Sequence, residues 1–165
     1  MQKMCNEQKY FLHYMKHTYY VVLAWKQIQY LLITNNLISK IEFDRINQLI
    51  IWHDNSKINV DEWLPYATKF YPIGNQDTTQ VKEAFKNAVE RHKLINLHHF
   101  ESLQNYTGLD WKCYIIEIIC DYIAMGWEFG VYIFEYYDKN RERIQLPHEY
   151  KTYLEQVLKP LDVRY

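Results

Sequence analysis

Glycine and proline are both scarce in this chain, at four each among 165 residues. These residues mark most strand ends and tight turns, and no stretch of the sequence alternates apolar and polar residues as a half-buried strand does. The lack of both signals argues against a sheet. We therefore predict an all-α fold: a single domain over residues 1–165, with a core of about residues 7–158 and about six or seven helices.

Cysteine is also sparse. Cys5, Cys113 and Cys120 are odd in number and lack CxxC spacing, which argues against a disulfide framework and favours a reducing compartment. The N-terminal residues lack the apolar core of a signal peptide. The longest apolar stretch, residues 114–126, is interrupted by two acidic residues and is too short to span a bilayer. We expect a cytoplasmic protein, in the host cytoplasm if the gene is viral, with no membrane partner.

Long basic runs are missing, and the formal net charge is −1. An extended nucleic-acid surface is therefore not expected. A small phosphorylated partner, such as a nucleotide, needs only a local positive site and stays open. The sequence also lacks a Gly-rich phosphate loop and a GxSxG motif, so it gives no support for covalent catalysis. The aromatic-rich last helices leave a homodimer open.

What the sequence does contain is helical periodicity with recognisable ends. Ser39 and Glu42 form a capping box that opens the second helix. Thr78 or Thr79 opens a later one, and Pro147 begins the last, which we expect to end before Pro160. Residues 96–108 read as irregular, with room for a short helix. The predicted helices span about residues 7–33, 39–52, 60–70, 78–93, 111–126, 128–137 and 147–159.

His53 and Asp54 are adjacent at the point where an apolar helix gives way to a polar turn. Neutral imidazole and ionised carboxylate are both good ligands for divalent cations. The dipeptide alone is a weak signal, because a solvated helix C-terminus has the same sequence pattern.

Asp121 lies in CYIIEIICDYIAM, the most apolar segment of the chain. A buried carboxylate is costly unless it is paired or bound to a metal. Glu117 shares its helix face one turn earlier. The alternative is a thin solvent-facing stripe formed by Glu117, Asp121 and Glu128.

The histidines supply further candidate ligands. His17 is in the first helix, and His92 is followed closely by His98 and His99. We interpret His13 as a surface histidine and His148 as part of a capping turn.

This arrangement resembles the HD superfamily of metal-dependent phosphohydrolases, in which a first-helix His, a His-Asp pair and a later Asp hold one metal and two further histidines hold a second. The finer pattern is similar to an uncharacterised branch, the domain of unknown function 5662. Three segments carry the resemblance, which extends over about residues 16–158: HDNSKINVDEWLPYATKFY, HKLINLHH and EIICDYIAMG. One departure is Leu97, where the branch commonly has proline.

The resemblance implies an HD-type helical bundle with one or two divalent metal ions (Mn, Fe, Zn, Co or Mg). The implied metal ligands are His17, His53, Asp54, His92, Asp121 and one of His98 or His99, with Asp54 bridging; we prefer His99 as the ligand. The implied catalytic residues are Asp54, Lys57 and His98; Lys57 and His98 would contact phosphate. Lys57 has a second interpretation, as a solvated loop lysine.

The implied activity is hydrolysis of a nucleotide or other small phosphoester by a metal-activated hydroxide. Two alternatives stay open: a di-iron oxygenase on the HD fold, and a regulatory module that binds metal or nucleotide without turnover. Several aromatic residues could wall a substrate pocket, although core packing is the favoured interpretation for most of them. They are Trp25, Trp63, Tyr66, Phe70, Trp111 and Trp127.

Overall fold

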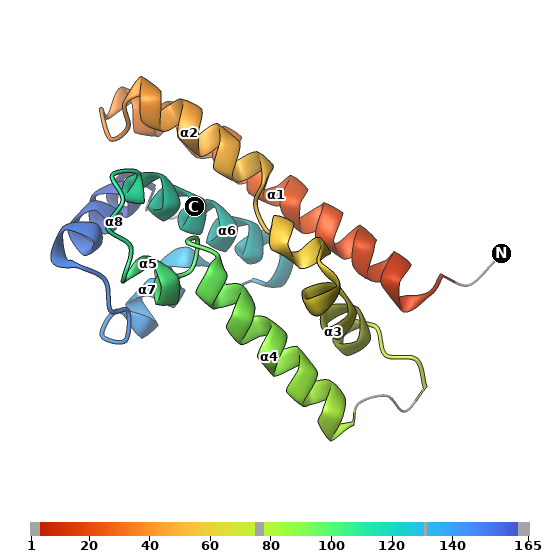
Figure 1. The fold of residues 1–165 in the computed structure, drawn as a ribbon. Coiled ribbons are helices and arrows are strands. Elements are labelled where there is room, and N and C mark those ends of the chain that lie inside the picture. The colour runs from red at the N-terminus through yellow and green to blue at the C-terminus, as the bar shows by residue number, and fades with distance from the viewer. Residues whose placement is uncertain (1–3, 75–77, 131, 162–165) are drawn as a thin grey trace.

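The computed structural model describes residues 4–74, 78–130 and 132–161. Within these ranges the chain is helical, as predicted, and contains no strand. Figure 1 shows the arrangement of the elements. They are α1 (Asn6–Thr34), α2 (Lys40–Ile51), the 3-10 helix η1 (Asn55–Ile58), α3 (Val60–Phe70), α4 (Thr79–Ile95), α5 (Phe100–Leu103), α6 (Trp111–Phe129), α7 (Ile133–Asn140) and α8 (His148–Leu161).

Helix α6 is the centre of the bundle. Every residue from Cys113 to Cys120 is at most 9% exposed, which is the burial expected of a helix that is apolar on nearly all sides. Helices α1 and α2 run side by side as an antiparallel pair (Figure 1), and both pack on α6. Helices α7 and α8 also pack on α6. Helices α3 and α4 pack against each other as a second pair, and α3 also packs against α1.

The buried apolar side chains form two clusters. The larger surrounds α6, and the smaller lies where α1, α3 and α4 meet, with Tyr10, Tyr66, Ala67 and Ala88 as its members. Along α1, the buried His17 separates Tyr10 of the smaller cluster from Val21 of the larger one. The other histidines of interest also fall where the chain passes between clusters. The fold therefore places a polar layer between two apolar clusters.

Most predicted helix ends are confirmed. The Ser39 hydroxyl accepts a hydrogen bond from the Glu42 amide, and the Glu42 carboxylate accepts one from the Ser39 amide. The Thr78 hydroxyl accepts a hydrogen bond from the Val81 amide and caps α4. The segment predicted as irregular contains the short helix α5.

Three predicted boundaries are wrong. The helix predicted from residue 128 begins at Ile133, because Glu128 still belongs to α6. Helix α6 does not end at Gly126 but continues to Phe129, because the residue that leaves the helix in the left-handed conformation is Gly130, at φ 72°. Helix α8 runs through Pro160 to Leu161. A proline in the last turn removes only one hydrogen bond, so it need not stop the helix before it.

All three cysteines are free, and Cys113 and Cys120 are buried. None of the described helices combines the length and apolarity that a bilayer crossing requires.

Candidate metal centre

Five elements bring the candidate ligands together. His17 comes from the middle of α1, His53 and Asp54 from the turn after α2, His92 from the last turns of α4, and Asp121 from α6. His98 and His99 follow on the connection between α4 and α5. Asp54 adopts the left-handed conformation, with φ 60° and ψ 14°. Such a conformation costs a non-glycine residue on the order of 1 kcal/mol or more, and it recurs at functional sites.

Asp54 is the hub of this arrangement and is only 2% exposed. Its Oδ2 atom lies 3.5 Å from His17 Nε2 and 3.8 Å from His53 Nε2. Its Oδ1 atom lies 3.0 Å from His92 Nε2 and 3.3 Å from His98 Nε2. The two oxygens of one carboxylate therefore face two separate pairs of imidazole nitrogens.

Asp121 completes the first group. Its Oδ1 atom lies 3.1 Å from His17 Nε2 and 3.7 Å from His53 Nε2. Its side chain is 15% exposed, at the edge of the polar layer. The sequence-predicted set His17, His53, Asp54 and Asp121 is thus gathered in one place.

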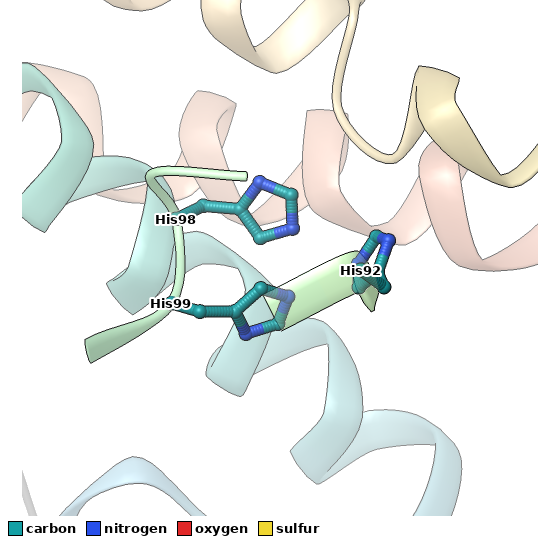
Figure 2. Close-up of side chains that lie close together, drawn as sticks. All are labelled: His92, His98 and His99. Carbon is teal, nitrogen blue, oxygen red and sulfur yellow. The ribbon is translucent and has the colours of Figure 1, made fainter. Parts of the chain in front are cut away.

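His92, His98 and His99 form the second group (Figure 2), and a ligand nitrogen of each lies within 4.8 Å of the others. The His99 ring centroid is 4.8 Å from that of His92 and 4.4 Å from that of His98. Burial and the charges of His98 and His92 lower the pKa of His99 to about 2. His99 is therefore neutral at physiological pH and keeps a nitrogen lone pair.

Buried glutamates hold the outer nitrogens of these rings. Glu62 lies 2.8 Å from His92 Nδ1, and Glu117 lies 3.0 Å from His53 Nδ1 and 3.4 Å from His98 Nδ1. Glu128 Oε2 faces His17 Nδ1 at 3.6 Å, a distance that allows an ion pair but is too long for a hydrogen bond. A carboxylate at Nδ1 fixes the tautomer and turns Nε2 inward, which is the usual outer arrangement around metal-binding histidines.

This role of the glutamates was not predicted from the sequence. The solvent-stripe alternative for Glu117 and Glu128 is wrong, because their side chains are only 5% and 6% exposed. Glu62 was not singled out, although it is completely buried. The available signal was the occurrence of acidic residues inside otherwise apolar helical segments.

The buried polar atoms test whether a cation fits here. Seven of them have no hydrogen-bond partner among the described residues. Five lie at the inner side of the ligand cluster, Nε2 of His53, His92, His98 and His99 and Oδ1 of Asp54, and the other two are Glu62 Oε1 and Glu128 Oε2. An unsatisfied buried polar atom costs about 1–3 kcal/mol. Imidazole nitrogens and carboxylate oxygens that converge in this way are the donor set of a borderline divalent metal. The residues therefore fit one or more metal ions.

The charges of the buried groups also favour a bound cation. Burial lowers the pKa of His53, but the carboxylates of Asp54, Asp121 and Glu117 outweigh it and raise the pKa to about 10. In the same way, Lys57 and His53 overcome burial and hold the pKa of Asp54 well below its ordinary value. Several buried carboxylates thus require compensating positive charge, which either a proton on His53 or a bound cation can supply.

Lys57 is not a solvated loop lysine. Its ammonium lies 2.5 Å from Asp54 Oδ2, and its side chain is 19% exposed. Lys57 lines a cavity of about 220 Å³ that also reaches His17, His92, His99 and Asp121. A second hollow, of about 340 Å³, shares Asp54 with it and is lined by His98 and Glu117.

The remaining histidines are His13 and His148. His13 is half-buried, with Nδ1 3.2 Å from the Tyr71 hydroxyl, and lines the first cavity, so its interpretation as a surface histidine is wrong. His148 is exposed at the first position of α8.

Of the aromatic candidates, Tyr66 and Phe70 line the cavity. Trp25 is buried in the larger cluster. Trp111 stacks on Tyr150, and Trp63 packs against Tyr10. Trp127 is 43% exposed.

Comparison with known proteins identifies the family of the chain but gives no function for it. No curated protein and no solved structure matches it. One family model matches residues 6–162, nearly the whole chain. The chain therefore belongs to a family of unknown function, DUF5662.

Proposed function

We propose that this chain is a metal-dependent phosphohydrolase of the HD type, acting on a small phosphoester. The observation that carries the proposal is the set of unsatisfied Nε2 and Oδ1 atoms around Asp54. A core that needed only stability would not bury so many donors and acceptors without partners.

The contacts support two cation positions that share Asp54. His17, His53, Asp54 and Asp121 would hold the first, and Asp54, His92 and His98 the second. The family resemblance favours His99 as the metal ligand and His98 as a phosphate contact. We propose the reverse, because His98 faces Asp54 Oδ1 and has Glu117 at its Nδ1, whereas His99 lines the cavity.

Hydrolysis suits this site because of the groups that surround it. Divalent cations, when bound, lower the pKa of a coordinated water and neutralise charge on phosphate oxygens. Lys57 would place a point charge against another phosphate oxygen once a cation replaces it at Asp54. In the net reaction a water oxygen bonds to phosphorus, the phosphorus–oxygen ester bond breaks, and the alcohol leaves with one of the water's protons.

The test uses metal content and phosphate release together. The full chain, loaded with Mn²⁺ or Co²⁺, should release phosphate from a panel of phosphoesters, and Asp54→Asn should abolish both metal binding and release. Asp44→Asn is the matched control, since Asp44 is an exposed aspartate on α2. Its activity should equal that of the unmodified chain.

Two results would replace this proposal. Anaerobically purified protein that holds two irons and consumes oxygen with an organic substrate would indicate a di-iron oxygenase. Stoichiometric metal with saturable ligand binding and no product under any metal would indicate a binding module.

A further inference from the structure

The cavity beside the metal ligands is small and largely aromatic. Its volume of about 220 Å³ is below the roughly 300–1,000 Å³ of pockets that take drug-sized ligands. Four helices supply its apolar wall. The wall residues are Tyr10, Tyr14, Tyr66, Phe70, Met125 and Phe129, with Val89 from α4.

The inner end of this cavity is polar. Lys57 lies there beside Asp54, with its ammonium 5.4 Å from the centre of the Tyr66 ring. The Tyr10 and Tyr66 side chains are at most 8% exposed. Neither hydroxyl has a hydrogen-bond partner among the described residues, so both can donate to a ligand oxygen. The combination suits one phosphoryl group held against the ligand cluster.

The outer end is apolar and open. Phe70 is 45% exposed and Phe129 is 52% exposed, and both contact the ring of His13. These rings present a surface on which a flat apolar group gains contact area.

The charge distribution of this cavity disfavours a polyphosphate. Apart from histidines, the cationic side chains that line the cavity among the described residues are Lys57 and Lys93. The Lys93 ammonium is 2.7 Å from Glu101 and is already paired. Beyond the ligand cluster, little positive charge is left for a second or third phosphate.

We propose, resting on the function proposed above, that the substrate is a phosphomonoester whose organic part is a single aromatic ring or an apolar group of that size. The phosphoryl group lies at the ligand cluster with Lys57 and the Tyr10 and Tyr66 hydroxyls. The ring lies against Phe70 and Phe129, beside the ring of His13. A nucleotide's sugar and base together are larger than this cavity, so part of them would lie outside it in solvent.

Binding of phosphonates, which cannot be hydrolysed at phosphorus–carbon by this chemistry, tests the proposal without turnover. Calorimetry on the Mn²⁺-loaded full chain should show phenylphosphonate binding about tenfold or more tighter than methylphosphonate, because the ring buries apolar area. Methylene phosphonate analogues of AMP and ATP, in which the corresponding ester oxygen is replaced by carbon, should bind no tighter than methylphosphonate. Equal affinity for phenylphosphonate and methylphosphonate, or tighter binding of either nucleotide analogue, would overturn the proposal.

Two phenylalanines provide a matched pair of variants. Phe129→Ala should weaken phenylphosphonate binding about fivefold to tenfold and leave methylphosphonate unchanged. Phe11→Ala removes a ring of similar exposure, 49%, that lies on α1 against Trp63 outside this cavity. It should leave both affinities unchanged. The proposal is wrong if the two variants behave alike.

These outcomes separate the substrate class from the activity. Selective phenylphosphonate binding with no hydrolysis of any phosphoester would sink the proposed hydrolase and leave the ligand class standing. Hydrolysis that favours AMP or ATP over phenyl phosphate would do the opposite.

Discussion

Two faces of α6 differ in how they are stabilised. Ile116 and Ile118 are completely buried in apolar surroundings. Glu117, between them, turns to His53 and His98, and Asp121 lies one turn further along the same face. The apolar face stabilises the fold by burial alone. The polar face is stable only through charges that it shares with other elements, and so it links folding to whatever cation binds there.

The largest effect should come from the apolar face. Ile118→Ala should lower the free energy of unfolding by about 2–5 kcal/mol, because it leaves a cavity beside a fully buried helix. Chemical denaturation measures this loss. Mn²⁺ should raise the stability of the variant by the same increment as it raises that of the unmodified chain, since no ligand has changed. A smaller metal increment in the variant would show that the two faces are not independent.

The next effect should come from the polar face. Glu117→Gln keeps the side-chain volume but removes the charge that orients His53 and His98. Metal affinity should fall about 10- to 100-fold, as measured by titration with Mn²⁺. Glu135→Gln changes an exposed glutamate of α7 and should leave the affinity unaltered. An unaltered affinity in Glu117→Gln would mean that the carboxylate has no part in the site.

The same contrast explains what could be predicted from the sequence. Helix positions follow from local periodicity and caps, so the Ser39–Glu42 box was found directly. The candidate ligands were located through a motif pattern, and the structure gathers them around Asp54. The wrong helix end at Gly126 has a local cause, because glycine ends a helix only where the backbone turns left-handed, and sequence alone does not show this.

The outer carboxylates could not be assigned in this way. Glu62 and Glu117 reach histidines 30 and 64 residues away in the chain. Whether an acidic residue in an apolar helix faces solvent or a buried imidazole depends on how distant helices pack. The choice between His98 and His99 also depends on the path of one loop.

The effect that is smallest within any one pH unit is a pH dependence that distinguishes the free from the metal-bound site. Burial lowers the pKa of His53, but its carboxylate neighbours raise it from 6.5 to about 10, and the pKa of His98 is also raised, against burial and the charge of His53, by Asp54 and Glu117. A pKa that is higher in the folded chain than in the unfolded chain contributes stability that is fully present below pH 6.5. That contribution is lost as the pH rises towards 10.

Metal-free protein should therefore lose stability between pH 6.5 and 8.5, by up to about 1.4 kcal/mol per pH unit for each proton. Metal-loaded protein should not, because a histidine that binds a cation has no proton to lose at that nitrogen. Thermal unfolding with and without a chelator, across this range, makes the comparison. Burial raises the pKa of the Cys113 and Cys120 thiols, so their ionisation in the unfolded chain lowers stability near pH 8.5, but it does so in both forms and cancels in the comparison. Parallel curves for the two forms would show that His53 carries no extra proton in the free site, and that another charge balances its carboxylates.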